Sequence, residues 1–75
     1  MNKLPQISAK ELIKALRKVG FVVVSQRGSH IKLRKLHPIR KTIIIPNHKI
    51  IRPGTLNNIL KIAEVSRQEL VRLTR

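Results

Sequence analysis

The first apolar pattern in the chain has the period of an amphipathic helix. Four apolar side chains fall on one face at that spacing: Leu12, Ile13, Leu16 and Val19. Ser8 and Glu11 form a capping box, in which the hydroxyl accepts from the first-turn backbone and the carboxylate reaches back. The pattern predicts a helix that begins after Ser8 and ends near Gly20, a residue suited to the C-terminal cap.

The period then changes to that of β-strands. Residues 21–26, 30–35 and 40–45 are rich in β-branched and apolar side chains, which indicates three strands. We expect strict alternation in the first strand, which places on one face Phe21, Val23 and Ser25. Gly28-Ser29 turns the chain, and Pro38 breaks the second strand and leaves His37 in a solvated loop. The two short connections predict an antiparallel meander.

Helical spacing returns in the last third of the chain. Pro53 or Thr55 stands near the start of a second helix. The apolar face of this helix is expected to contain Leu56, Ile59, Leu60 and Ala63. Ser66 and Glu69 form a second capping box, which predicts a short terminal helix. Its apolar residues are Leu70, Val71 and Leu73.

The order of these elements predicts one α+β domain over residues 1–75. It is α-β-β-β-α with a short extra C-terminal helix. Helices with one apolar stripe need a sheet to cover, and we expect them on one face of the three-stranded antiparallel sheet. The opposite face of the sheet would then stay open to solvent.

The clearest chemical signal lies in residues 27–34. From His30 onward the side chains alternate, so His30, Lys32 and Arg34 share one face while Ile31 and Leu33 share the other. Imidazole suits proton transfer near neutral pH, and cations beside it suit a phosphate-bearing substrate. The same residues also describe an ordinary solvated sheet face, and on their own they favour that simpler interpretation.

The charge of the chain is strongly unbalanced, with 17 Lys and Arg against three acidic residues and a net charge of +14. This excess implies a polyanionic partner, usually nucleic acid, with an acidic protein as the alternative. An anionic membrane surface fits less well, because the cations are spread over helices and strands. No apolar run is long enough to span a bilayer and nothing resembles a signal peptide, so the expected location is the cytoplasm.

The acidic residues are Glu11, Glu64 and Glu69, and the chain has no Asp and no Cys. No two of these carboxylates stand at a spacing that is useful for holding a divalent cation or for paired acid–base chemistry. We therefore expect no metal site and no cofactor. A reaction on nucleic acid would depend on histidine and on cations instead.

Several short motifs follow one another along the chain. They are Leu4-Pro5, Lys10-Glu11-Leu12-Ile13, Gly20-Phe21, Arg27-Gly28-Ser29-His30, Ile45-Pro46-Asn47-His48, Gly54-Thr55-Leu56 and Ile59-Leu60. In this order and spacing the chain resembles, over nearly its whole length, the HicA-type toxins. These are small mRNA interferases of bacterial and archaeal toxin–antitoxin pairs. The family often has Gly between its last two helices, where this chain has residues 63–66, Ala-Glu-Val-Ser.

The resemblance implies a fold like that of a double-stranded-RNA-binding domain. It also implies ribosome-independent, metal-independent endonucleolytic cleavage of mRNA, which arrests translation. The family's essential histidine corresponds to His30, which would be the catalytic general acid or base. The residues that would bind RNA are Arg27, Gly28, Ser29, Lys32, Arg34 and His48. The implied partner is a HicB-type antitoxin that covers the active site and binds DNA, so we expect no sequence-specific DNA binding by this chain itself.

Within this set, Lys32 and Arg34 would hold phosphate, and Gly28 would let the backbone approach it closely. Ser29 would either donate a hydrogen bond or cap the turn. A second proton-transfer group would be His48 or a lysine. The main alternative is a non-catalytic RNA-binding module, which the fold and the charge suit equally well. A DNA-binding module fits less well, because no helix-turn-helix pair stands out.

Overall fold

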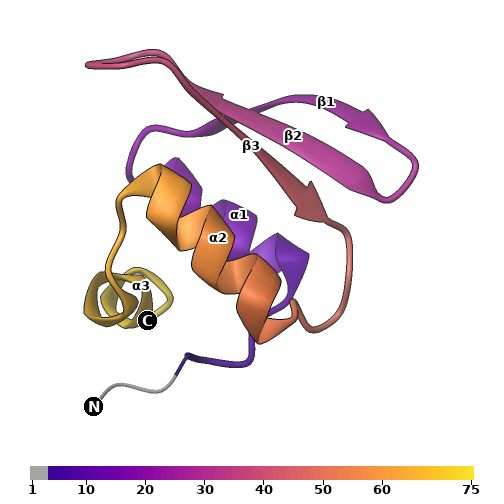
Figure 1. Ribbon diagram of the computed structural model, residues 1–75, viewed down its shortest axis with the longest axis vertical. Helices are drawn as coiled ribbons and strands as arrows, with labels where there is room; N and C mark the ends of the chain where they lie inside the picture. Colours follow the sequence, from indigo (N-terminus) through magenta and orange to yellow (C-terminus); the bar gives the residue numbers. More distant parts are fainter. Residues whose placement is uncertain (1–3) are drawn as a thin grey trace.

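The computed structural model describes residues 4–75, so the first three residues of the domain predicted over residues 1–75 lie outside the described residues. The elements are α1 (Ala9–Arg17), β1 (Val22–Arg27), β2 (His30–Lys35), β3 (Lys41–Pro46), α2 (Pro53–Ala63) and α3 (Arg67–Leu73). The strands form one antiparallel sheet in the order β1-β2-β3, and the helices lie on one side of it (Figure 1). The predicted α+β fold, with a short extra C-terminal helix, is confirmed.

Local hydrogen bonds set both ends of α1. The Ser8 hydroxyl accepts from the Glu11 amide at 3.1 Å, and the Ser8 amide donates to the Glu11 carboxylate at 3.2 Å, as the capping box predicts. At the other end Gly20 takes a positive φ of 103°, which lets the Phe21 amide donate back to the Leu16 carbonyl at 3.1 Å. The chain therefore turns sharply out of the helix and directly into β1.

One aliphatic core joins the two layers. The largest fully buried side chains are those of Phe21, Leu12, Leu16, Leu33, Ile43, Ile45, Ile51, Leu56 and Leu70. The predicted apolar face of α2 is buried at all four positions, whereas Ile13 of α1 and Val19, just beyond the end of α1, pack only partly against the core. Among the described residues no polar side chain is buried, so the core depends on the hydrophobic effect alone.

Strand β1 departs from the predicted alternation. In the sheet register Val23 lies opposite Leu33 and Ser25 lies opposite Lys32, so Val24 is an extra residue and forms a β-bulge. Directly opposed residues share a face, which puts Val23 on the covered face with Leu33 and Ser25 on the open face with Lys32. The expectation that Val23 and Ser25 share a face is therefore wrong.

The link between α2 and α3 is the segment in which the sequence departs from the family that it resembles. Glu64 takes a left-handed conformation there, with φ of 58° and ψ of 41°. Its carboxylate pairs with the Lys41 ammonium at the start of β3. This hydrogen bond and the charge of Lys41 hold the pKa of Glu64 below its ordinary value. The chain thus makes a left-handed turn at a residue other than glycine, and α3 begins just beyond it at the Ser66 cap.

We predict that Glu64→Gly is more stable than Glu64→Gln by about 1 kcal/mol, because only glycine removes the Cβ contact that opposes a left-handed residue. Both variants lose the carboxylate, so the comparison isolates the backbone. Urea unfolding of the two variants at neutral pH measures the difference. Equal stability would show that the left-handed turn carries no such strain.

The Lys41–Glu64 pair also predicts a pH dependence. A lowered pKa in the folded state means that the pair contributes its full stabilisation at pH values above the ordinary carboxyl pKa of 4.5. The contribution is lost as the pH falls through the lowered pKa. The stability advantage of the wild type over Glu64→Gln should be small, because the pair is exposed, and should vanish in acid. An advantage that grows on acidification would contradict the assignment.

Candidate functional site

The turn between β1 and β2 positions the first functional side chain. Arg27 and His30 pair across the hairpin, which leaves Gly28 and Ser29 as a two-residue loop. Gly28 has a φ of 56° and Ser29 does not have a positive φ, the pattern of a type II′ turn. The Ser29 carbonyl accepts from the Asn47 amide at 2.6 Å, so the loop after β3 holds the turn in place.

The open face of the sheet carries the predicted cations. His30, Lys32 and Arg34 follow one another along β2 on the face that the helices leave uncovered. In the sheet register, Arg27 of β1 lies directly opposite His30 of β2. Arg34 donates from its Nε to the Thr42 hydroxyl at 3.3 Å, which fixes the guanidinium against β3. The predicted basic surface is therefore present on β1 and β2, with β3 beside it.

A shallow hollow of about 550 Å³ lies on this open face, next to the hairpin turn. Its lining residues are Ser25, Gln26, Arg27, His30, Lys32 and Ile44. His30 is exposed, so its imidazole is accessible to a bound molecule. The hollow contains one imidazole and two cations and no carboxylate, so it can bind an anion and transfer a proton beside it.

The structure brings together only part of the predicted site. Arg27, His30 and Lys32 line the hollow, whereas Arg34 lies farther along β2 and outside the lining. Gly28 and Ser29 form the turn itself. The bond from Asn47 to the Ser29 carbonyl argues that Ser29 serves this turn through its backbone.

His48 follows β3 in the loop that holds the hairpin turn. Its amide donates to the Pro46 carbonyl at 2.8 Å and its carbonyl accepts from the Ala9 amide at 3.0 Å. These bonds place His48 at the same end of the domain as His30, with an exposed side chain. His48 does not line the hollow, so its part in the site stays a prediction.

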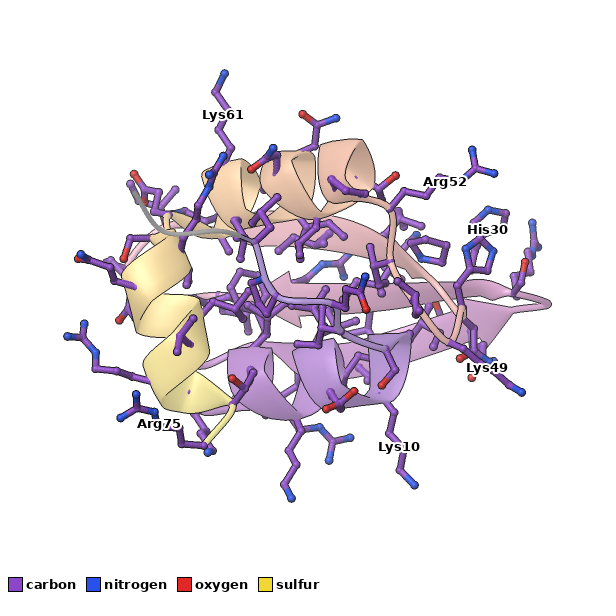
Figure 2. The ribbon with its side chains drawn as sticks, turned by 90° about the horizontal axis from the view of Figure 1, so that it is seen from below. Lys10, His30, Lys49, Arg52, Lys61 and Arg75 are labelled. Atoms are coloured by element: carbon purple, nitrogen blue, oxygen red, sulfur yellow. The ribbon has the colours of Figure 1, made fainter. Side chains whose placement is uncertain are left out.

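Two further cations lie at this end of the molecule. Figure 2 shows Lys49 and Arg52 projecting at the end that carries His30, away from α3 and Arg75. Both side chains are exposed. The strand pattern gives no signal for them, because they belong to the irregular segment between β3 and α2.

The sequence interpretation also missed Ser25, Gln26 and Ile44 in the lining of the hollow. A signal for Ser25 was available. Counting back from a two-residue turn pairs Arg27 with His30 and Ser25 with Lys32, whereas counting forward from Phe21 puts Ser25 on the other face. The two counts disagree by one residue, and a bulge is the structure that reconciles them.

The carboxylates all lie away from this site. Glu11 belongs to the α1 capping box, Glu64 pairs with Lys41, and Glu69 lies in the first turn of α3. Within residues 4–75, no group of three His, Cys, Asp or Glu side chains could hold a metal ion. The electrostatic character of the open face is therefore set by cations alone.

Comparison with known protein families identifies the class of this protein as a toxin of a bacterial toxin–antitoxin pair. The model of the family described as "HicA toxin of bacterial toxin-antitoxin" matches residues 9–65, from α1 to the end of the α2–α3 link. The match covers more than half of the chain, so this chain belongs to the HicA toxin family. No curated protein matches the chain.

Family membership assigns a toxin role and implies a cognate antitoxin as the partner. The match spans α1, the three strands and α2 and ends before α3. No helix between residues 4 and 75 is both long and apolar enough to cross a membrane.

Proposed function

We propose that this toxin is an endoribonuclease that cleaves mRNA in the cytoplasm, independently of the ribosome and without a metal ion, and so arrests translation. The observation that supports it best is the hollow on the open sheet face. His30 lies there with Arg27 and Lys32, accessible to a polymer and with no carboxylate among its lining residues. Membership of the toxin family supplies the biological context for such an activity.

The proposed reaction uses a nucleophile that RNA itself provides. The ribose 2′-hydroxyl attacks the adjacent phosphorus, a new P–O2′ bond forms, and the P–O5′ bond breaks. One proton leaves the 2′-oxygen and one joins the 5′-oxygen, which gives a 2′,3′-cyclic phosphate and a free 5′-hydroxyl. His30 acts either as the general base for the first proton or as the general acid for the second. DNA lacks the 2′-hydroxyl and would not be cut.

The cations supply phosphate binding and charge stabilisation. Arg27 and Lys32 flank His30 in the hollow and would contact the oxygens of the phosphate that reacts. Arg34, held by Thr42, would bind a phosphate farther along the strand. Gly28 has open space around the position of a Cβ, so the backbone of the turn can approach the RNA closely.

A second proton-transfer group is needed for the complete reaction. His48 lies in the loop that bonds to the hairpin turn, which supports it as a candidate. Lys32 and Lys49 are the lysine candidates, since Lys32 lines the hollow and Lys49 lies at the same end of the molecule as His30. Glu11 is engaged in the α1 capping box and Glu64 with Lys41, and Glu69 lies in the first turn of α3, so no carboxylate reaches the hollow, which favours a metal-free reaction with histidine and lysine.

One observation favours a second candidate function, a non-catalytic RNA-binding module. Among the described residues, no hydrogen-bond partner orients the His30 imidazole. Many catalytic histidines are oriented by a carboxylate or a carbonyl group. In the binding-module interpretation His30 contacts RNA as one more surface residue, and the RNA stays whole.

We predict that the purified wild type cleaves single-stranded mRNA in EDTA and that His30→Ala lowers the cleavage rate by about 10²–10⁴-fold. His37→Ala is the matched control. It removes an exposed imidazole from the loop between β2 and β3, at the other end of β2, and should cleave like the wild type. Circular dichroism verifies that both variants are folded, and a gel-shift measurement of intact RNA verifies that both still bind.

Three results would count against this proposal. Equal cleavage by wild type and His30→Ala would show that His30 is not catalytic. Loss of wild-type cleavage in EDTA would contradict the metal-free reaction. Binding of RNA by all three proteins without any cleavage would favour the binding-module function.

A further inference from the structure

A second groove lies on the other face of the sheet, between α1 and β1. Its volume is about 590 Å³, and its lining residues are Lys10, Ile13, Lys14, Arg17, Val23, Gln26, Ile31 and Asn47. Val23 and Ile31 belong to the covered face, so this groove opens on the side opposite to the His30 hollow. Gln26 lines both sites, so they adjoin at the edge strand β1 but open on different faces of the sheet.

The rim of this groove is positively charged. Lys10, Lys14 and Arg17 recur every three to four residues, so they line one side of α1. All three are exposed. Within the described part of the chain, none of the three has an ion-pair or hydrogen-bond partner. The groove has no carboxylate among its lining residues, so this charge is uncompensated.

The floor of the groove is apolar and incompletely covered. Ile13, Val23 and Ile31 form it, and Val23 remains 38% exposed although it lies on the covered face. All six residues of β1 are exposed, including two further valines of the strand, Val22 and Val24. Because β1 is an edge strand of the sheet, its outer backbone groups have no neighbouring strand. An apolar floor beside an open edge is typical of a surface that another chain covers.

We propose that this groove binds an acidic, partly apolar segment of the cognate antitoxin. The charge of the rim selects carboxylate side chains, and the floor accepts aliphatic ones between them. The inference rests on membership of the toxin family, which implies an antitoxin, and it requires neither RNA cleavage nor a catalytic His30.

The composition of the groove favours a peptide over RNA as its occupant. Its lining contains three aliphatic side chains, whereas the His30 hollow contains one, Ile44, among polar and charged residues. A continuous aliphatic floor gains little from charged phosphates and sugars, whereas it suits leucine, isoleucine or valine side chains of a peptide.

Binding at this groove would hold the toxin without blocking its hollow. A segment seated between α1 and β1 lies behind the sheet and leaves His30 open on the other side. Inhibition of the toxin and its retention by the antitoxin would thus depend on different surfaces. A variant that weakens the groove contact should lower the affinity for antitoxin, and should affect RNA binding no more than an equal change of charge elsewhere on the domain.

The test compares two double variants that have the same charge. Lys10→Glu with Lys14→Glu changes the groove rim, and Lys61→Glu with Arg72→Glu changes exposed residues of α2 and α3. Each substitution replaces a positive charge with a negative one, so each double variant lowers the net charge of the chain from +14 to +10. Figure 2 shows Lys10 and Lys61 projecting on opposite sides of the domain. The two double variants therefore lose the same amount of general electrostatic attraction to an acidic partner.

We predict that the groove variant binds the cognate antitoxin about tenfold more weakly than the control variant, mainly through slower association. Surface plasmon resonance measures both rates with the purified antitoxin from the neighbouring reading frame. A further variant, Val23→Asn, keeps every charge and should weaken binding through faster dissociation, because it removes apolar contact at the floor.

Several results would overturn the inference. These are equal antitoxin affinity of the two charge variants, absence of binding by the wild type, and loss of RNA binding by the groove variant while its antitoxin affinity stays unchanged. The last result would make the groove an RNA surface. Failure of the wild type to cleave RNA bears only on the proposed nuclease function, since the antitoxin assay contains no RNA.

Discussion

The hairpin between β1 and β2 is the constraint on which the rest of this structure depends. Gly28 supplies the positive φ that a two-residue turn needs, and the Asn47–Ser29 hydrogen bond holds that turn against the loop after β3. The resulting register places His30 on the open face and Ile31 in the core. A shift of one residue would exchange the two faces, so the same bonds that form the sheet also determine which side chains reach a ligand.

Much of this arrangement follows from local patterns in the sequence. The Ser8 cap, the strand from His30 to Lys35 and the apolar face of α2 are confirmed, because capping chemistry and side-chain period specify them without reference to distant residues. The bulge at Val24 could not be predicted from periodicity alone, because it reconciles the buried Phe21 with the hairpin register. The groove between α1 and β1 is a product of tertiary packing, and only the helical spacing of its basic rim can be read from the sequence.

The distribution of charge separates two surfaces on this small domain. The few carboxylates stabilise the fold locally, Glu11 at a helix start and Glu64 through Lys41, and neither opposes the cations of the two concave sites. The hollow around His30 combines cations with an imidazole, which suits chemistry at a phosphate. The α1 groove combines cations with an apolar floor, which suits a peptide. In these two proposals the excess of positive charge serves two different kinds of partner, RNA at the hollow and a peptide at the groove.

In the proposed reaction the RNA supplies its own nucleophile and His30 moves a proton. An RNA with one mapped cleavage position is compared with a twin that carries a single 2′-deoxynucleotide immediately before that position. We expect the wild-type toxin to cut the first RNA to a 2′,3′-cyclic phosphate and to leave the twin intact there. Cleavage of the twin at the same position, with a 5′-phosphate on the product, would contradict the proposed reaction.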